Sequence, residues 1–339
     1  MSKTSAILVT GVAGFIGFSL ARRLLEAGRV VIGVDNLTPY YNPKLKEARL
    51  AVLAQSPTFT FRRIDLADRI ATMALFEGGA FGPVVHLAAQ AGVRYSIDHP
   101  YTYLDANLAG FLNVLEGCRH RQTGHVVFAS SSSVYGANTH LPFSETDNVD
   151  HPISLYAATK RSNELMAHAY SHLYGLPVTG LRFFTVYGPW GRPDMAMFIF
   201  ADAIMAGRPL PLFNGGRMRR DFTYVDDVTE TVERMIDCPP RGDPGFRADR
   251  PDPSASSAPW RIYNVGNNKS VEVAYVVELL EKELGRSTAR NPLPLQPGDV
   301  IETCANVDAL MHDFDFRPDT PVEEGVRRFV AWYRDYCRV

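Results

Sequence analysis

The sequence has little of what marks secreted, membrane-spanning or cysteine-ligated metal proteins. Its four cysteines, Cys118, Cys238, Cys304 and Cys337, lie far apart and form no CxxC pair, a pattern that favours free thiols over disulfides or zinc ligands. No apolar run approaches the roughly 20 residues of a transmembrane helix. The apolar run "AILVT" near the N-terminus is too short for the hydrophobic region of a signal peptide. The predicted location is the cytoplasm.

An excess of charge of one sign is also absent. The formal net charge is -2 over 339 residues, which argues against nucleic acid or an anionic membrane as a partner. Two histidines four residues apart, His168 and His172, are not accompanied by an HExxH pattern or an acidic third ligand, so a solvated helix face is predicted there rather than a metal site. With 46% hydrophobic and 21% charged residues, the chain has the composition of a globular protein long enough for two domains.

Short segments rich in β-branched or aromatic residues alternate with segments of helical period in the first half of the chain. In "FSLARRLLEAG" three leucines, Leu20, Leu24 and Leu25, share one stripe, and Gly28 is the predicted C-cap. Strands that alternate with helices imply right-handed crossovers and a parallel sheet. The predicted fold is α/β, a doubly wound parallel sheet of Rossmann type. The predicted strands are residues 6–10, 30–35, 59–65, 84–88, 125–130 and 178–184.

The alternation of strands and helices fails after Phe184. Residues 239–259 are rich in Pro, Gly and Ser and are predicted to form an exposed, mobile loop, because strand-like residues 261–266 follow directly. Two helices are predicted in the tail, at "EVAYVVELLEKELG" and "VEEGVRRFVAWYRDYC". The predicted domains are a nucleotide-binding domain at 1–182 with a returning segment at about 223–265, and a smaller C-terminal α/β substrate-binding lobe at 183–222 and 266–339.

The stretch "VTGVAGFIG" places Gly11, Gly14 and Gly17 between a predicted strand and a predicted helix. Glycine lets the chain turn tightly, approach a pyrophosphate with its backbone and pack helix closely on strand. Asp35, 18 residues after Gly17, ends the next predicted strand. A carboxylate there accepts hydrogen bonds from the adenosine ribose and repels a 2′-phosphate. The pattern predicts a dinucleotide site that prefers NAD to NADP.

Further cofactor contacts are expected where the third and fourth predicted strands end. Asp65 and Leu66 stand where an adenine edge would lie, and the small Ala88 and Ala89 let the backbone approach the cofactor. The predicted cofactor residues also include Phe15, Ile16, Asn36, Leu87, Gln90, Tyr156 and Lys160.

The stretch "YAATK" puts Tyr156 and Lys160 four residues apart, on one face of a predicted helix. A phenol has a reference pKa of about 10, too high for a base at neutral pH, but a nearby ammonium stabilises the phenolate. The same lysine could hold the nicotinamide ribose. A hydroxyl cluster, "SSSS", ends the preceding predicted strand. A hydroxyl, a phenol and an ammonium are therefore predicted to share one site.

Taken together, these motifs resemble the extended short-chain dehydrogenases/reductases. Within that superfamily the chain is most similar to the NAD-dependent nucleotide-sugar epimerases, and among these to the UDP-glucuronate 4-epimerases. The resemblance covers essentially the whole chain and implies a homodimer that binds a UDP-sugar. It is carried further by "NLTPYYNPKLKEARL", "QAGVRYSIDHP", "RFFTVYGPWGRPDMA", "NGGRMRRDFTYVDDV" and "LQPGDV".

The resemblance implies a redox epimerisation at C4 of the sugar with tightly held NAD. Tyr156 as phenolate would remove the proton of the 4-hydroxyl while the C4 hydride moves to the nicotinamide. The 4-keto sugar would then turn over, and hydride and proton would return to its other face. Ser131, three residues before Val134 of "VYG", matches the catalytic Ser/Thr of the family and would hydrogen-bond to the 4-oxygen. Ser131, Tyr156 and Lys160 are the predicted catalytic residues.

Ser132 and Ser133 are informative because neither is a carboxylic acid. The related dTDP-glucose 4,6-dehydratases have an Asp-Glu pair there, and the related UDP-glucuronate decarboxylases usually have a Glu. A hydroxyl can donate to a sugar carboxylate without adding negative charge, and holding that carboxylate in one orientation would suppress loss of CO2 from the 4-keto acid. Thr185 stands where many sugar-nucleotide epimerases have Asn. All three hydroxyl residues are predicted to bind the C5 carboxylate.

The remaining predicted substrate contacts are single residues that the resemblance suggests. Phe213 could lie against uracil, Arg220 could pair with the diphosphate, and Asp299 could accept from the uridine ribose. Arg192 is a further candidate near the sugar or the diphosphate, and Arg94 is a further predicted substrate contact.

Three alternatives stand beside C4 epimerisation of UDP-glucuronate. A UDP-glucose or UDP-N-acetylhexosamine 4-epimerase is disfavoured by Thr185 and the two serines, and a UDP-glucuronate decarboxylase by the missing carboxylate. A non-catalytic NAD-binding sensor would need the glycine loop but neither Tyr156 nor Lys160.

Overall fold

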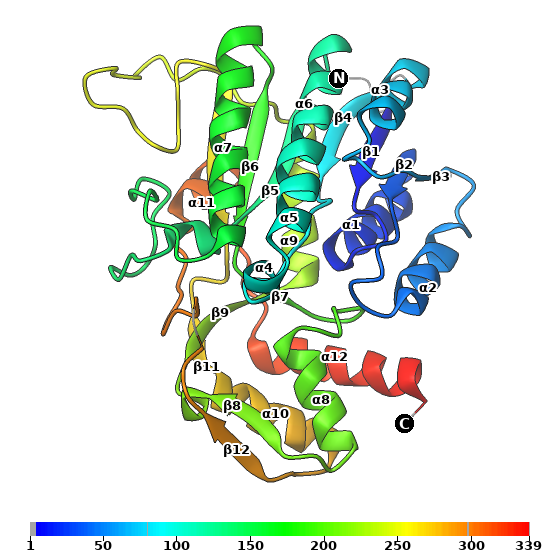
Figure 1. The fold of residues 1–339 in the computed structure, drawn as a ribbon, viewed down its shortest axis with the longest axis vertical. Helices are drawn as coiled ribbons and strands as arrows, with labels where there is room; N and C mark the ends of the chain where they lie inside the picture. The colour runs from blue at the N-terminus through cyan, green and yellow to red at the C-terminus, as the bar shows by residue number, and fades with distance from the viewer. Residues whose placement is uncertain (1–4, 80, 297, 339) are drawn as a thin grey trace. The chain divides into compact units, whose positions relative to one another are not determined.

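The computed structural model describes residues 5–79, 81–296 and 298–338. Within them the chain forms two units, and it passes between these units repeatedly along its length (Figure 1). The first unit comprises Met1–Asn138, Glu145–Phe183 and Thr229–Asn264, and the second comprises Thr139–Ser144, Phe184–Val228 and Val265–Val339.

A seven-stranded sheet forms the centre of the first unit. Its strands are β1 (Ala6–Thr10), β2 (Val31–Asp35), β3 (Phe59–Arg63), β4 (Phe81–His86), β5 (Val126–Ser131), β6 (Val178–Phe183) and β10 (Trp260–Val265). The order across the sheet is β10-β6-β5-β4-β1-β2-β3, and the pairings from β3 to β6 are parallel. The doubly wound sheet predicted from the sequence is confirmed. The strand order reverses between β1 and β4, and in such sheets ligands bind in the crevice at this point, outside the carboxyl ends of the strands.

Helices cover both faces of this sheet, as right-handed crossovers require (Figure 1). On one face, α3, α6 and α7 pack side by side. On the other face, Arg23 of α1 forms an ion pair with Glu233 of α9. The helices that follow the strands are α1 (Phe15–Glu26), α2 (Pro43–Leu53), α3 (Arg69–Gly78), α4 (Tyr95–Asp98), α5 (Pro100–Tyr103), the π-helical turn η1 (Leu104–Ala109), α6 (Gly110–His120), the 3-10 turn η2 (Ser132–Tyr135), α7 (Leu155–Tyr174) and α9 (Val225–Ile236).

The helices of the first unit begin and end where local chemistry favours it. The side chains of Asn42, Asp68 and Ser154 accept hydrogen bonds from backbone N–H groups in the first turns of α2, α3 and α7. α7 ends at Gly175 in the left-handed conformation. Gly28, the predicted cap of α1, lies one residue beyond the cap and also has a positive φ of 75°.

The second unit contains two small sheets and four helices among its described residues. The three-stranded sheet has β9 between β7 and β11, and the two-stranded sheet pairs β8 with β12 in parallel. The elements are β7 (Thr185–Tyr187), α8 (Ala196–Met205), β8 (Leu210–Phe213), the 3-10 turn η3 (Asn214–Gly216), β9 (Arg219–Tyr224), β11 (Ser270–Glu272), α10 (Val273–Leu284), β12 (Arg290–Leu293), α11 (Asp308–Phe314) and α12 (Val322–Cys337).

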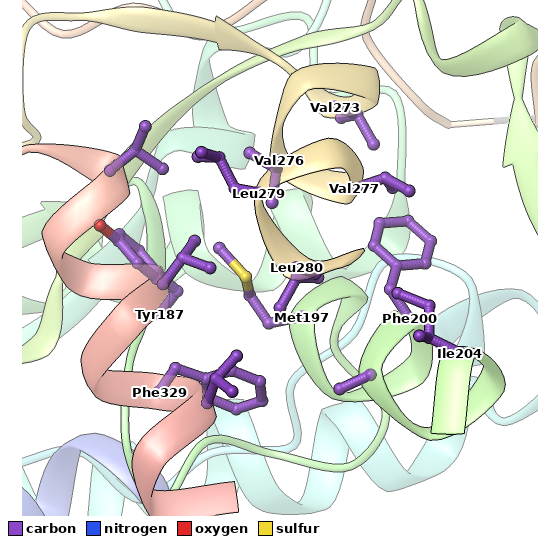
Figure 2. Close-up of a cluster of buried hydrophobic side chains, with 14 of the residues drawn as sticks. Tyr187, Met197, Phe200, Ile204, Val273, Val276, Val277, Leu279, Leu280 and Phe329 are labelled. Atoms are coloured by element: carbon purple, nitrogen blue, oxygen red, sulfur yellow. The ribbon is translucent and has the colours of Figure 1, made fainter. Parts of the chain in front are cut away.

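Each unit has its own hydrophobic core. In the first unit, Leu8, Val84, Phe111 and Phe128 are among the buried side chains between the sheet and its helices. Figure 2 shows the core of the second unit, where α8, α10 and α12 meet and where the labelled side chains include Met197, Leu280 and Phe329. The two predicted tail helices are confirmed as α10 and α12.

Two predicted strands differ from the structure by two or more residues at an end, and most of the others differ by one residue. The strand predicted at residues 84–88 is β4 (Phe81–His86), which begins earlier because Phe81 pairs with Ala6 of β1. The strand predicted at residues 59–65 ends at Arg63, because Ala67 N–H then donates to the Asp65 carboxylate and turns the chain.

The loop predicted at residues 239–259 is exposed only in part. Near its end, Ser254, Ala255 and Ser256 are buried within the first unit. Ser256 Oγ lies 2.9 Å from Nε2 of His168, whose ring also meets Trp260 edge-on. The solvated helix face predicted at His168 is therefore wrong for that residue, which the end of the loop covers.

The described residues contain no group of three or more side chains that could hold a metal ion. All four cysteines are free, and only Cys118 among them is fully buried. No helix among the described residues is both long enough and apolar enough to cross a bilayer.

A buried histidine beside β5 should make the protein sensitive to acid. His125 is completely buried, with Nδ1 at 3.0 Å from the Ile236 carbonyl oxygen and Nε2 at 2.9 Å from Thr179 Oγ1. Burial lowers the pKa of His125 to about 4. Above pH ~6.5 the ring is neutral in both states, but from there down to about pH 4 only the unfolded chain takes up the proton, so stability falls by up to about 1.4 kcal/mol per pH unit.

The measurement is the free energy of unfolding in denaturant between pH 7 and pH 5, for the parent protein and for His125→Gln. The variant should show a shallower pH slope by about one bound proton. Equal slopes in the two proteins would contradict the assignment of this proton uptake to His125.

Candidate active site

The glycines of "VTGVAGFIG" form the turn between β1 and α1. Gly11 has a φ of +69°, and a Cβ there would lie 2.7 Å from the backbone nitrogen of Ala88. A Cβ at Gly14 or Gly17 would lie 2.9 or 2.2 Å from the Gly11 carbonyl oxygen. No side chain caps the N-terminus of α1 and its first turn has no acidic residue, so its amides and the positive end of its dipole suit an anion. The predicted cofactor residues Phe15 and Ile16 begin α1.

Asp35 ends β2 with its carboxylate directed at this turn. Its Oδ2 accepts from Ala13 N–H at 3.1 Å and its Oδ1 accepts from Leu37 N–H at 2.8 Å. The ammonium of Lys46, which is also buried, lies 3.7 Å from Oδ1. A buried carboxylate therefore stands beside the glycine turn, where the sequence predicts contact with a ribose.

The ends of β2 and β3 lie together. The amide of Asn36 donates to the Asp65 carboxylate at 3.1 Å. The carbonyl oxygen of Leu66, a buried residue, accepts from Asn113 Nδ2 at 2.8 Å. Three of the predicted cofactor residues thus form one edge beside Asp35.

The end of β4 is joined to the end of β1 by Thr10. Its Oγ1 accepts from the N–H groups of Leu87 and Ala88, each at 3.2 Å, and lies 2.9 Å from Nδ1 of His86. Burial, and then the charge of Lys160, lower the pKa of His86 to about 3, so its ring is neutral. The small Ala88 and Ala89 follow, with Gly11 beside Ala88.

The hydroxyl and the ammonium of the predicted catalytic set lie at the same end of β5. Ser131 is the last residue of that strand, and Tyr156 and Lys160 lie in the first two turns of α7. Lys160 is buried, and its Nζ donates to the Ala129 carbonyl oxygen at 2.9 Å. Tyr156 is half-buried, with its ring edge-on to Tyr103 at a centroid distance of 6.1 Å.

Ser131 also begins the 3-10 turn η2. Its Oγ accepts from Ser133 N–H at 3.1 Å, and it donates to Ser133 Oγ, also at 3.1 Å. Ser132 and Ser133 are half-buried in this turn. The structure therefore links two of the three predicted serines directly. Arg94 is exposed and immediately precedes α4.

The predicted nucleotide contacts lie in the second unit. The Arg220 guanidinium donates to the carbonyl oxygens of Arg219, at 2.9 Å, and of Ile301, at 3.2 Å. Asp299 lies two residues before Ile301, so it belongs to the segment that contacts Arg220. Phe213 ends β8.

Two further predicted substrate residues lie elsewhere in the second unit. Thr185 begins β7 and pairs with Phe222 of β9. Arg192 forms an ion pair with Asp194, with its Nε 3.0 Å from Oδ1 and its Nη2 2.5 Å from Oδ2.

A family model described as "NAD dependent epimerase/dehydratase family" matches residues 7–249, which is more than half of the chain. The chain belongs to the NAD-dependent epimerase/dehydratase family. A relative named "Probable UDP-glucuronate 4-epimerase" from Rhizobium meliloti (strain 1021) is 49% identical over 327 residues, which is 96% of each chain.

Solved structures of this family show the same fold. The crystal structure of a UDP-glucuronic acid 4-epimerase from Bacillus cereus, in complex with UDP-glucuronic acid and NAD, has a TM-score of 0.86 and 29% identity and covers 98% of this chain and 99% of that one. A UDP-glucose 4-epimerase from Thermotoga maritima, with UDP-glucose, has a TM-score of 0.85 and 28% identity over 98% of this chain and 99% of that one. Fold similarity alone therefore does not distinguish UDP-glucuronate from UDP-glucose as the substrate.

Two buried polar features at this site were not predicted from the sequence. The first is Asn107. Asn107, in the π-helical turn η1, accepts from Gln90 N–H at 2.8 Å and donates to Gln90 O at 3.1 Å and to Thr159 Oγ1 at 3.0 Å. Asn107 therefore fixes the predicted cofactor residue Gln90 against α7.

The second buried polar feature is the ion pair of Glu164, on α7, with Arg182, on β6. The one sequence signal for it was a charge in the middle of an apolar strand.

Lys160 should impose an alkaline limit on activity. Burial lowers the pKa of Lys160 to about 8 in the ligand-free protein, so above that pH the side chain loses the positive charge that stabilises a phenolate. We expect kcat/KM to fall between pH 8 and pH 9. In Lys160→Arg the charge persists at every accessible pH, so any remaining activity should lack this decline. A parental kcat/KM that stays level to pH 9 would contradict the prediction.

Proposed function

We propose that this chain is a UDP-glucuronate 4-epimerase, which interconverts UDP-glucuronate and UDP-galacturonate. The observation that carries the proposal is the 49% identity, over nearly the full length of both chains, to the Rhizobium meliloti relative of that name. The hydroxyl residues at positions 131–133 and 185 agree with it, because none of them adds a carboxylate beside a sugar acid. The cytoplasmic location predicted from the sequence is part of this proposal.

The first unit has the features that bound NAD requires. Its glycine turn leaves no room for a Cβ at Gly11 or Gly17, and the uncapped start of α1 offers amides to a pyrophosphate. Asp35 would accept from the adenosine ribose, while Asn36, Asp65 and the other predicted cofactor residues would line the carboxyl edge of the sheet. When bound, NAD serves as acceptor and then donor of the C4 hydride.

Proton transfer is the task of the chain's own side chains. Tyr156 as phenolate would take the proton of the 4-hydroxyl and later return it, and the Lys160 ammonium would favour that phenolate. Ser131 would hydrogen-bond to the 4-oxygen. In the structure the Ser131 hydroxyl donates its proton to Ser133 Oγ. To donate to the 4-oxygen of the substrate, Ser131 would have to give up this bond.

We propose that polar side chains bind the sugar carboxylate and the nucleotide. Ser132, Ser133 and Thr185 would donate to the carboxylate and hold it in one orientation. For the nucleotide, we propose Phe213 against uracil, Arg220 at the diphosphate and Asp299 at the uridine ribose. Arg94 and Arg192 are proposed as further contacts, and the second unit would thus form most of the substrate-binding lobe.

Product analysis tests the proposed function. Purified protein is incubated with UDP-glucuronate without added NAD, and the nucleotide sugars are separated by chromatography. Formation of UDP-galacturonate is the expected result. Formation of UDP-xylose, or epimerisation of UDP-glucose with no turnover of UDP-glucuronate, would overturn it.

A homodimer is also proposed, because large apolar side chains are exposed on the packed helices of the first unit. Tyr101 of α5 and Leu173 of α7 are 78% and 67% exposed, and Leu165 of α7 is also exposed. A contiguous patch of exposed apolar side chains is typical of a surface that another chain covers, and we propose that these residues belong to such a patch. Light scattering should give twice the chain mass of 37.6 kDa, and Leu173→Asp with Leu165→Asp should shift the mass toward one chain. A monomeric parent protein would contradict the prediction.

A further inference from the structure

Two hydrogen bonds tie α7 to the last residues of β5. Lys160 Nζ donates to the Ala129 carbonyl oxygen at 2.9 Å. One helical turn further along, the Glu164 carboxylate accepts from Ser130 Oγ at 2.6 Å. Because the two helix residues are four apart, they lie on the same face of α7. The helix is therefore held against the strand at two successive turns.

Each oxygen of the Glu164 carboxylate accepts two hydrogen bonds. Its Oε1 accepts from Arg182 Nε at 2.9 Å as well as from Ser130, and its Oε2 accepts from Arg182 Nη2 at 3.0 Å and from Arg161 Nη1 at 3.1 Å. Glu164 and Arg182 are both fully buried. Burial alone would raise the pKa of Glu164, but the charge of Arg182 and these hydrogen bonds outweigh it and hold the pKa below its ordinary value. The carboxylate is therefore ionised in the folded protein.

Arg182 also reaches the other end of η2. Its Nη1 donates to Tyr135 Oη at 3.1 Å, and its guanidinium lies 4.9 Å from the centroid of the Tyr135 ring. Tyr135 Oη in turn donates to Asn264 Oδ1 at 2.6 Å. The ion pair thus holds Ser130 just before residues 131–134 and Tyr135 just after them. We call residues 131–134 the serine segment.

We propose that Arg182 and Glu164 are positioning residues for the epimerisation. They fix the serine segment at both of its ends and fix α7 to the same strand, so that Ser131 and Tyr156 can act on one sugar hydroxyl. Neither residue needs to touch the substrate, since Glu164 acts through Ser130 and Arg182 through Tyr135. This inference rests on the proposed function.

The physical chemistry of buried ion pairs favours a positioning role over a stabilising one. Taking two charges out of water is costly, and an apolar pair of similar size often stabilises a protein as well or better. What an apolar pair cannot do is bond in fixed directions to Ser130 and Tyr135. Such direction matters here, because a displacement of about 1 Å in a catalytic group can lower the rate about 10²-fold.

The test compares two hydroxyl deletions on neighbouring strands. Ser130→Ala removes the hydroxyl bonded to Glu164 and leaves the ion pair in place. Thr179→Val removes an equally buried hydroxyl that lies 2.9 Å from His125 Nε2, at the opposite end of the sheet from the serine segment. Both should lower the melting temperature similarly. Ser130→Ala should lower kcat about 10-fold with an unchanged KM and NAD content, whereas Thr179→Val should keep the parental kcat.

Arg182→Lys gives a stronger version of the same test. It keeps the charge but loses the planar fork that reaches Glu164 and Tyr135 together. We expect a fall in kcat of about 10²-fold with KM unchanged. If Arg182→Lys does not fold, the comparison of Ser130→Ala with Thr179→Val still tests the inference.

Amide hydrogen exchange supplies a readout that needs no substrate. The N–H of Ser133 is bonded to Ser131 Oγ, and the N–H of Gly136 is bonded to the Ser133 carbonyl oxygen at 3.1 Å. Both amides should exchange faster in Ser130→Ala and Arg182→Lys than in the parent or in Thr179→Val. If the parent does not turn over UDP-glucuronate, the proposed function fails, and exchange still tests the role of the ion pair. Two results would overturn the inference. The first is that Ser130→Ala and Arg182→Lys both keep the parental kcat and the parental amide exchange rates. The second is that Thr179→Val loses as much kcat as Ser130→Ala.

Discussion

Replacing Tyr156 by phenylalanine should lower kcat by about 10²–10⁴-fold, the usual contribution of a positioned general base. The substitution removes one oxygen atom and leaves the ring contact with Tyr103, the Ser154 cap of α7 and the bond from Lys160 to Ala129. The loss should therefore fall on proton transfer, with the fold retained and KM little changed. The measurements are the rate of UDP-galacturonate formation and the amount of NAD released when the purified variant is denatured.

Tyr170→Phe is the matched control for this experiment. Tyr170 lies on the same helix, and its hydroxyl donates to the Glu116 carboxylate at 2.6 Å. Its removal deletes the same atom and a hydrogen bond, so stability should fall slightly while kcat stays at the parental value. A Tyr156→Phe variant with a near-parental rate would show that another group is the base. A variant that no longer holds NAD would show that the loss of activity comes from the predicted cofactor contact of Tyr156 and not from proton transfer.

The parts of the fold that the sequence predicted are those determined by local patterns. β1, a run of apolar and β-branched residues, was predicted with both of its ends, and the glycine turn was expected from its place between a strand and a helix. β4 was predicted too short because Gly82 and Pro83 are poor strand formers. Its first residue is held in the sheet by pairing with Ala6, a contact between distant residues that no local pattern contains.

The same limit applies to the candidate site. The sequence assigned Ser130 to the strand alone, although its hydroxyl donates to Glu164. A charge at Arg182, inside a strand of apolar residues, does predict a partner, because an unpaired buried charge is too costly. Which partner it takes depends on how α7 packs on the sheet. The three-dimensional arrangement brings together Glu164 and Arg182, 18 residues apart in the chain.

The buried ion pair gives the second large expected effect, on stability. Arg182→Met should lower the free energy of unfolding by about 3–5 kcal/mol, because Glu164 would then be a buried charge without its principal partner. Adding Glu164→Met should recover most of this loss, since two apolar side chains can fill the same space at little cost. Arg161→Met is the control. Arg161 also pairs with Glu164 but is partly exposed, so its removal should cost about 1 kcal/mol or less.

The Glu164→Met, Arg182→Met double variant separates stability from position. If the pair only held the protein together, recovery of the unfolding free energy in the double variant would bring back kcat as well. If it holds the serine segment, stability returns and kcat does not, because methionine cannot bond to Ser130 or Tyr135 in fixed directions. Denaturant unfolding and kcat, measured on the same preparations, distinguish these outcomes. A double variant that recovers both would assign the ion pair to folding alone.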